Sequence, residues 1–428
     1  MVGAAMAATL GSNPLFEGRR ILLLEGSSQK PYQGVPNDYS NRTCALSPST
    51  VKFLSSFGAW DTITNMRFQE VKSMQVWDSA SDSLITFNHP EMLEDLAYIV
   101  ENDIILEALM KQLDHMSNSV EIRFGSKVID YHLPHPGGFE ETTDANPFAG
   151  VSLEGGEKLW TKLLIGADGY KSLLRKTAGI HTVDWEYGQF GVVATVNIQE
   201  TPDNNVAWQR FLKTGPIAML PLSSKHSSLI WSTSTEQAKS LAKLSDESFA
   251  DAVNNAFWSD EMRDTVADTA ARRFDDLLRG VGLQNGGSRQ LPPTVIGVTE
   301  GTRAMFPLGL CHSSQYVKTR VALIGDAAHR IHPMAGQGVN LGFGDVESLA
   351  NKISQAVTNG MDIGSINPLL EYETERQRAV LPVMCLTDGL NRLYSASWTP
   401  IVLARCLGLQ ATNALGPLKD RLMKQAMG

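Results

Sequence analysis

Long apolar runs and cysteines are both scarce in this sequence. No stretch approaches the ~18 consecutive apolar residues that a membrane-spanning helix requires, although 43% of the 428 residues are hydrophobic. Four cysteines, Cys44, Cys311, Cys385 and Cys406, lie far apart and form no CxxC pair. This spacing argues against a disulfide framework and predicts reduced thiols in a reducing compartment.

Basic charge is also limited. Lys and Arg total 37 against 46 Asp and Glu, which gives a net charge of −9. General nucleic-acid binding is therefore not expected. The first residues match neither a secretory signal nor an arginine-rich transit segment. The sequon Asn41-Arg42-Thr43 is accordingly interpreted as a chance match.

Motifs for hydrolytic, metal and P-loop chemistry are missing as well. The chain has no Ser/His/Asp triad motif, no P-loop and no HExxH. His329 and His332 lie three residues apart, but no carboxylate-rich cluster accompanies them. We therefore assign no catalytic side chain and no metal site.

The most informative stretch that is present runs from Arg320 to Val357. It begins with a short apolar run, Val321–Ile324, that predicts a buried strand, and Gly325-Asp326 ends it. A loop with one proline and two glycines follows, and apolar residues then recur at helical spacing. An acid at a strand end can accept hydrogen bonds from a sugar or ribityl hydroxyl. Glycines and a helix start can approach an anion.

A second string, from Lys162 to Arg175, repeats this order. A strand at Leu163–Ile165 leads into the acidic glycine turn around Asp168, and a helix that contains Ser172 follows. One such turn alone is an ordinary strand–loop–helix connection. Two acidic glycine turns at strand ends, each opening a helix, favour a nucleotide-cofactor site.

The N-terminal residues predict the back half of a dinucleotide-binding unit. Residues 1–8 predict a helix, and Arg19–Glu25 predicts a strand that ends in an acid. Glu25 follows Gly3 by 22 residues (25 − 3), the spacing of a Rossmann unit in which the acid binds ribose hydroxyls. The front half, with the first strand and the first two glycines, is missing from the sequence, and we expect a gap there.

The region between these motifs predicts mixed structure. A helix is expected over Val51–Trp60 with Arg42 in the loop before it, and a second over Ile99–Leu113 with Asn102 in its first turn. Strands are expected over Met74–Phe87 with a turn at 79–83. Residues 134–147 read as an exposed loop.

Residues 189–233 alternate in a way typical of an antiparallel sheet. Such a sheet, next to a cofactor domain, would form the wall of the site on the substrate side. For each side chain that could line this wall, plain core packing is the alternative. The candidates are Phe211, Met219, Leu220 and Trp231. A polar helical segment follows at 241–279, and the chain is expected to re-enter the cofactor domain near 303–310.

The C-terminal segment, 391–428, is basic and partly apolar. Two interpretations stay open: docking on a membrane surface, or a packed terminal helix with a solvated basic face. Five bases stand against one acid, Asp420, for a charge of +4 (5 − 1), and the bases are Arg392, Arg405, Lys419, Arg421 and Lys424.

Several strings carry a resemblance to a known family. They include SNRTCALSPST, LLIGADG, NNVAWQRFL, GPIAMLPL and ALIGDAAHRIHPMAGQGVN, and the similarity runs from Val2 to the end. The chain resembles the eukaryotic flavin monooxygenases of ubiquinone biosynthesis, within the aromatic hydroxylases similar to 4-hydroxybenzoate hydroxylase. The implied fold is α/β: a doubly wound FAD-binding domain without its first strand, an antiparallel-sheet substrate domain and a helical C-terminus. The implied FAD-binding domain comprises residues 1–60, 100–175 and 300–370. The implied substrate domain comprises residues 61–99 and 176–299, and the helical C-terminal region comprises residues 371–428.

The resemblance implies insertion of one oxygen atom into the aromatic ring of a polyprenyl phenol or hydroxybenzoate, through a flavin hydroperoxide. Asp326 would meet the ribityl chain, the segment from Pro333 to Asn340 would line the flavin ring, and Asp168 would serve FAD and pyridine nucleotide. The implied FAD-binding residues are Gly3, Glu25, Arg42, Asn102, Asp168, Asp326, Pro333, Gly336, Gly338 and Asn340.

The same resemblance implies molecular oxygen as co-substrate and electron supply from ferredoxin and ferredoxin reductase. It also implies other subunits of a ubiquinone-biosynthesis complex as partners, and a peripheral location on the matrix side of the mitochondrial inner membrane. Two alternatives remain. The chain could be a truncated, non-catalytic isoform that acts as a subunit of the complex, or an NAD(P)H-dependent flavin hydroxylase of another aromatic substrate.

Overall fold

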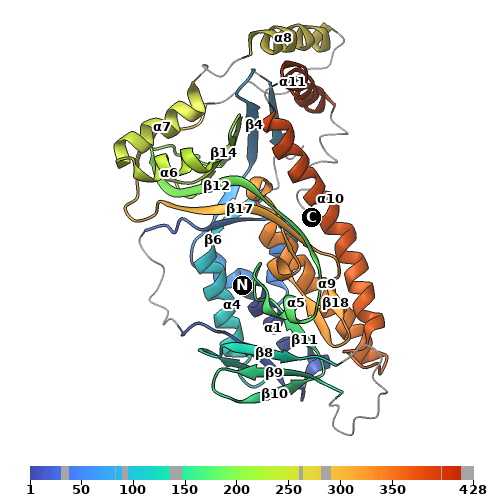
Figure 1. Cartoon of the computed structure of the whole chain (residues 1–428). Helices are drawn as coiled ribbons and strands as arrows, with labels where there is room; N and C mark the ends of the chain where they lie inside the picture. The colour runs from blue at the N-terminus through green and yellow to red at the C-terminus, as the bar shows by residue number, and fades with distance from the viewer. Residues whose placement is uncertain are drawn as a thin grey trace.

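The computed structural model describes residues 1–29, 38–81, 83–88, 95–134, 147–259, 264–280, 291–396 and 398–415. Figure 1 shows an elongated molecule with a large curved sheet in its upper half and several smaller sheets with helices below. The long helix α10 (Ile366–Ser395) runs along one side and joins the two halves. No helix within these ranges is long and apolar enough to cross a bilayer.

The remaining helices differ widely in length. They are α1 (Val2–Gly11), α2 (Pro48–Ser55), α3 (Ala59–Thr64), α4 (Asn102–His115), α5 (Leu173–Thr177), α6 (Thr235–Lys243), α7 (Asp246–Trp258), α8 (Thr265–Gly280), α9 (Gly338–Thr358) and α11 (Thr399–Ala414). Three short 3-10 helices are η1 (Pro14–Phe16), η2 (Gly325–Ala327) and η3 (Pro333–Ala335).

The largest sheet is mainly antiparallel, as the alternating sequence predicts. In spatial order its strands are β20 (His329–Arg330), β17 (Ala304–Ser313), β12 (Thr182–Ile198), β15 (His226–Ser234), β14 (Gly215–Pro221), β13 (Val206–Leu212), β4 (Ser73–Asp78) and β5 (Leu84–Asn88), and β16 (Val295–Val298) pairs with β12. The predicted hairpin over Met74–Phe87 is confirmed as β4 and β5. Residues 304–313 form β17 of this sheet, so the expectation that the chain re-enters the cofactor domain near 303–310 is wrong.

The lower half contains four small sheets. They are β1 (Ile21–Leu24) with β7 (Val120–Arg123); β2 (Thr43–Leu46), β6 (Ala97–Glu101) and β3 (Gln69–Val71); β8 (Val128–His132), β9 (Ala149–Leu153) and β10 (Lys158–Thr161); and β11 (Leu164–Gly166), β19 (Val321–Leu323) and β18 (Val317–Lys318). Both β1–β7 and β11–β19 are parallel pairs, as a doubly wound domain requires.

The parallel strands form two separate groups. Among the described residues, β1 pairs only with β7, and β11 pairs only with β19. All four β1 side chains are half-buried rather than buried. The helix α1 lies close to both groups, because a Cβ atom built on Gly3 would lie 3.1 Å from Ala167 Cβ and 3.8 Å from Leu23 Cδ1. β1 and β11 therefore each keep one unpaired edge at the predicted gap.

Two predicted helices begin or end elsewhere than expected. The helix expected over Val51–Trp60 is divided into α2 and α3, because the chain turns at Gly58. The helix expected from Ile99 begins at Asn102 instead. Residues 97–101 form β6 between β2 and β3, so tertiary strand pairing overrides the helical spacing there. Most of the predicted loop at 134–147 lies outside the described residues.

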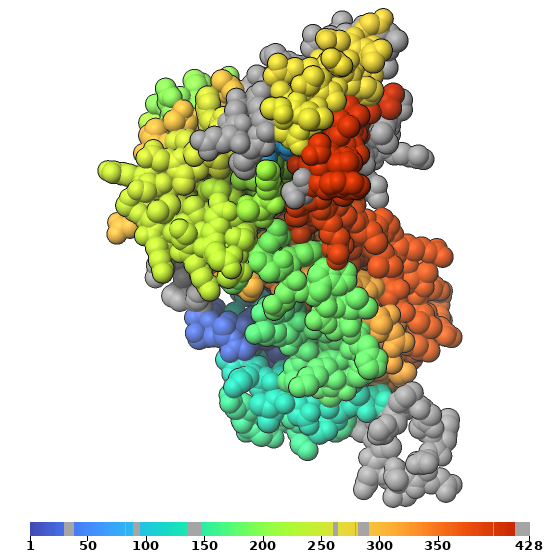
Figure 2. Space-filling view, turned by 45° about the horizontal axis from the view of Figure 1, so that its top comes forward, coloured from blue at the N-terminus to red at the C-terminus, as the bar shows by residue number. Residues whose placement is uncertain are grey.

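The described part of the C-terminal segment is packed against the rest of the molecule. Arg405 is 4% exposed, and its Nε lies 2.7 Å from the carboxylate of Asp78, itself 1% exposed. Figure 2 shows α8, in yellow, beside the red C-terminal helices at one end of the molecule. Arg405 therefore cannot contribute to a basic surface, and the packed-helix interpretation holds for α11. Lys419, Arg421 and Lys424 lie outside the described residues.

Candidate functional site

The acidic turn after β19 presents its carboxyl group to solvent. Asp326 lies in η2 and is exposed, although much of its surroundings is protein. That partial desolvation raises the pKa of Asp326, and the nearby His329 and Arg330 oppose the rise. Gly325 has φ +59°, and a Cβ atom there would lie 3.2 Å from Val2 Cγ2. Glycine is therefore required where α1 meets this turn.

The loop after this turn leads directly into α9. Pro333 begins η3, Gly336 follows with φ +61°, and Gly338 is the first residue of α9. Asn340 fixes the start of the helix to the strand β2: its Nδ2 donates to the carbonyl oxygen of Ala45 at 2.8 Å. Its Oδ1 accepts from the backbone N–H of Ser47 at 3.0 Å. The structure thus shows Asn340 anchoring the loop.

The start of α1 converges on the same place. Burial lowers the pKa of the Met1 amino group, whereas the nearby Glu25 and Cys44 raise it. Burial raises the pKa of the Cys44 thiol to about 12, the positive Met1 amino group lowers it, and the nearby Asp326 raises it further. The helix start and the acid after β19 therefore lie within electrostatic reach of one thiol, and the acid after β1 lies within electrostatic reach of the helix start.

Two residues expected at the cofactor lie next to one another. The backbone N–H of Asn102 donates to the carbonyl oxygen of Arg42 at 2.9 Å, and Asn102 Oδ1 accepts from Cys44 Sγ at 2.8 Å. The side chain of Arg42 is exposed. Glu25 Oε1 accepts from both the N–H and the hydroxyl of Ser27, at 2.9 and 2.8 Å, so the turn after β1 is internally braced.

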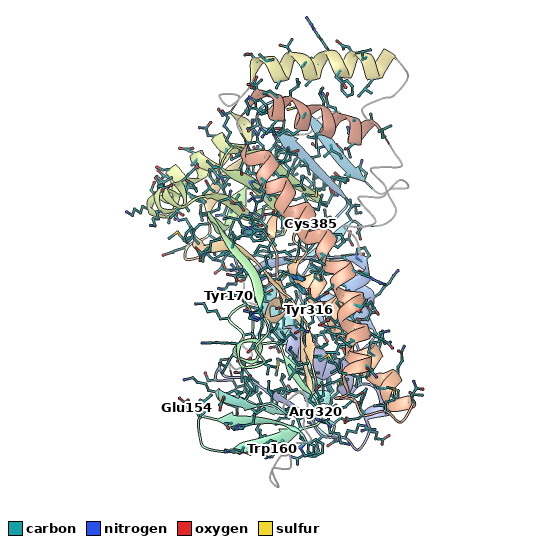
Figure 3. All side chains as sticks on the ribbon, turned by 45° about the vertical axis from the view of Figure 1, so that its right-hand side comes forward. Glu154, Trp160, Tyr170, Tyr316, Arg320 and Cys385 are labelled. Carbon is teal, nitrogen blue, oxygen red and sulfur yellow. The ribbon has the colours of Figure 1, made fainter. Side chains whose placement is uncertain are left out.

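The second acidic turn caps a helix and is tied to the first turn. Asp168 Oδ2 accepts from the backbone N–H of Leu173 at 2.9 Å, at the start of α5. Arg175 Nη1 donates to the carbonyl oxygen of Ala327 at 2.7 Å, and its Nη2 donates to that of Tyr170 at 2.5 Å. Tyr170 is labelled in Figure 3. One guanidinium therefore joins both acidic turns, a role that the sequence did not reveal.

The two histidines near the loop have separate partners. His329 Nε2 lies 2.7 Å from Asp345 Oδ2. His332 Nδ1 accepts from the backbone N–H of Met334 at 3.2 Å, and its ring packs edge-on against Tyr187 with the ring centroids 5.1 Å apart. The His-x-x-His spacing thus serves two structural contacts.

Comparison with known proteins identifies the family. The family model described as FAD binding domain matches residues 22–276 and 302–387. The ubiquinone biosynthesis monooxygenase COQ6 of Xenopus tropicalis is 52% identical over 423 residues, covering 99% of this chain and 90% of that protein. The human COQ6 protein is 50% identical with the same coverage, and the Saccharomyces cerevisiae protein is 30% identical, covering 98% and 90%. This chain belongs to the COQ6 family of FAD-dependent monooxygenases.

Solved structures agree on the fold. The p-nitrophenol 4-monooxygenase PnpA of Pseudomonas putida superposes with a TM-score of 0.68 at 19% identity, covering 100% of this chain and 96% of that one. PqsL of Pseudomonas aeruginosa, a probable FAD-dependent monooxygenase, gives 0.66 at 18% identity, covering 95% and 97%. This chain and these bacterial proteins therefore share one α/β architecture, and its C-terminal part is helical.

The residues of this COQ6-family chain fit an FAD at its ribityl and ring end. An exposed acid follows β19, and the two helix starts of α1 and α9 lie beside it. The helices α9 and α1 pack closely beside this acid, because a Cβ atom on Gly342 would lie 2.8 Å from Val2 Cγ2. Oxygen acceptors suit ribityl hydroxyls, and helix starts suit phosphate.

Two of the four candidates for the substrate wall point away from the cofactor loop. Met219 and Trp231 belong to the core cluster that contains Phe249 and Val253 of α7. Figure 1 shows α6 and α7 over that side of the sheet. Plain core packing, the alternative reading, is therefore correct for Met219 and Trp231.

Phe211 and Leu220 lie on the opposite face, which meets the smaller sheets. Leu220 pairs across the sheet with Ser228, whose hydroxyl lies 2.8 Å from Thr43 Oγ1 of β2. Phe211 stacks on Tyr394 of α10 with the ring centroids 3.7 Å apart.

Phe211 also shares an apolar cluster with Met334 of the cofactor loop. Val76 of β4 belongs to that cluster and Met74 packs against it, although neither residue was predicted to lie at the site. They reach it because β4 pairs in parallel with β13, a register that neither strand reveals alone.

Proposed function

We propose that this chain is an FAD-dependent monooxygenase that inserts one oxygen atom into the aromatic ring of a polyprenyl phenol or hydroxybenzoate intermediate of ubiquinone biosynthesis. The observation that carries the proposal is the identity of about half of all residues to COQ6 proteins over 99% of the chain. Family membership supports the reaction class, and the position of Asp326 beside two helix starts supports the cofactor.

FAD, when bound, would supply the oxygen-activating chemistry, and the chain's own residues would bind and orient it. Asp326 would accept a hydrogen bond from the ribityl chain, and Glu25 would bind the adenosine ribose. Gly3 and Gly338 begin the helices whose starts would face the phosphates and the ring, and Pro333 begins the segment that would line the ring. Asp168, Arg42, Asn102, Gly336 and Asn340 complete the proposed FAD-binding set.

The sheet face that carries Phe211 would present the substrate ring. Met334 packs against the apolar cluster that contains Phe211, so the sheet and the cofactor loop contribute to the same wall. An apolar wall there would exclude water from the reacting ring. We assign this face, with the strands of the large sheet, to the substrate domain and the smaller parallel sheets to the FAD domain.

The proposed setting follows from the relatives, whose names describe them as mitochondrial. A polyprenyl tail partitions into a bilayer, so the enzyme would act at the surface of the inner membrane on its matrix side. The C-terminal region, 371–428, would contribute to this contact. Electron supply from ferredoxin and its reductase, and association with other enzymes of the pathway, complete the proposal.

The test is product formation by the purified chain. The chain is incubated with FAD, a short-chain prenyl hydroxybenzoate, oxygen and either ferredoxin with its reductase or NADPH alone. A ring-hydroxylated product with the ferredoxin system supports the proposal. If the chain takes up no flavin even with an apolar strand and a Gly-x-Gly turn fused ahead of α1, it is instead a non-catalytic subunit. Turnover of another phenol with NADPH, without turnover of the prenylated substrate, would indicate an NAD(P)H-dependent flavin hydroxylase of another aromatic substrate.

A further inference from the structure

The carboxylate of Asp345, on α9, lies directly behind the acidic turn. Its side chain has no solvent exposure. Oδ2 accepts from the backbone N–H of Gly325 at 2.8 Å and lies 2.7 Å from His329 Nε2. Oδ1 accepts from Arg376 Nε at 2.7 Å. Three donors from three different elements thus converge on one buried carboxylate that contacts the residue immediately before Asp326.

This carboxylate is ionised in the folded protein. Burial alone would raise the pKa of Asp345, but the charge and hydrogen bond of His329, and those of Arg376, outweigh burial and lower it. A charged acceptor binds a backbone N–H more strongly than a neutral one does. The bond from Gly325 to Asp345 is therefore among the strongest restraints on the turn.

The helix α10 supports the same turn with a row of side chains. Tyr372 donates its hydroxyl to the carbonyl oxygen of Leu323 at 2.7 Å, just before the turn. Glu373 Oε2 accepts from the backbone N–H of Tyr316 at 2.6 Å, and Figure 3 shows Tyr316 beside α10. Arg376 continues this row, and a Cβ atom on Gly344 would lie 2.8 Å from its Nη2. The guanidinium of Arg376 therefore packs directly on α9, in space that a side chain larger than glycine at position 344 would occupy.

We propose that Asp345 is a positioning residue for the flavin: by holding the N–H of Gly325, it fixes the direction in which Asp326 presents its carboxylate to the ribityl chain. This inference rests on the proposed function, because it assumes that Asp326 binds FAD. Asp345 does not touch the cofactor itself. Its effect on FAD affinity must therefore pass through Asp326, and this dependence separates positioning from general stability.

The test is a double-mutant cycle on the full chain with an apolar strand and a Gly-x-Gly turn fused ahead of α1, and FAD affinity is measured by titration of the apoprotein and quenching of flavin fluorescence. Asp345→Ala is expected to weaken FAD binding about tenfold when Asp326 is present, and less than about twofold in an Asp326→Ala background. Asp345→Asn keeps an oxygen acceptor for Gly325 and is expected to restore most of the affinity. Asp345→Asn also replaces Asp345→Ala in the test if the alanine variant does not fold.

Arg376→Met is the matched control, because it removes one partner of the carboxylate and leaves the bond to Gly325. It is expected to lower the melting temperature while FAD affinity changes less than about threefold. Additive effects of the two alanine substitutions would overturn the inference, since they would show that Asp345 acts independently of Asp326. If the unsubstituted chain binds FAD but Asp326→Ala binds equally well, the proposed role of Asp326 fails first, and the inference fails with it.

Discussion

The imidazole of His332 is a buried base that contacts no opposite charge within the part of the chain that the structure describes. It is 0% exposed, and burial lowers its pKa to about 4, although Asp388 opposes that shift. A histidine that stays neutral in the folded state takes up its proton on unfolding below pH 6.5. Stability must therefore fall as the pH drops from about 6.5 toward about 4.

This group predicts an acid-labile fold. Between pH 7 and pH 5, His332 should remove about 2 kcal/mol from the free energy of unfolding. His332→Asn keeps an acceptor for the Met334 N–H without a titrating ring, so its stability should change less over the same range. Urea unfolding at both pH values measures the difference. Equal acid sensitivity in both proteins would show that His332 is not responsible.

The carboxyl group of Asp326 is expected to cost stability while it serves binding. Its pKa is raised, so the contribution of this group to folding is most favourable below its ordinary range and declines as the pH rises through the raised value. Asp326→Asn should therefore leave the melting temperature of the apoprotein at pH 7 unchanged or higher. FAD affinity should fall roughly tenfold, because a charge-assisted hydrogen bond is lost. A lower melting temperature with unchanged affinity would contradict both expectations.

At the scale of single elements, α11 is held by one buried ion pair. Arg405 donates to Asp78 of β4 and to the carbonyl oxygens of Leu393, Tyr394 and Ala396. These contacts join the end of α10, the start of α11 and the edge hairpin of the large sheet. The terminal helix is thus part of the wall that carries Phe211.

Breaking this pair predicts a large loss of stability. Arg405→Leu leaves Asp78 charged and buried, and should cost about 3–5 kcal/mol in the free energy of unfolding. The double variant Asp78→Leu, Arg405→Leu removes both charges and should recover most of that loss. Chemical denaturation measures both variants. Arg392→Leu is the control, since Arg392 is exposed and should change stability by less than about 1 kcal/mol.

At the scale of the whole molecule, β1 and β11 each have one edge that pairs with no other strand among the described residues. Exposed strand edges promote association between chains, and β1 keeps its leucines only half-buried. The chain expressed as printed should therefore aggregate readily and retain little FAD. Fusing an apolar strand and a Gly-x-Gly turn ahead of α1 should raise both solubility and flavin content. Size-exclusion chromatography and the flavin-to-protein absorbance ratio test this. Stoichiometric FAD in the unextended chain would contradict it.

The local motifs were predictable because short-range geometry determines them. The strand before Asp326, the turn at Asp168 and the body of α4, though not its start, follow from apolar spacing and from glycines at strand ends, which are properties of neighbouring residues. The antiparallel sheet over 189–233 was predictable for the same reason, because alternation encodes a strand with two different faces.

Only the tertiary structure decided which face of the sheet lies toward the cofactor loop and which distant residues each side chain contacts. Alternation places Met219 and Phe211 on opposite faces, but the direction toward the cofactor loop depends on where α7 and α10 pack. Arg405 looks like a surface base in sequence, and only Asp78, brought close by the fold, makes its burial favourable. Arg175 and Asp345 act on turns that lie far from them along the chain. Long-range contacts of this kind leave no periodicity in one sequence, so the sequence determined the motifs and the fold decided their partners.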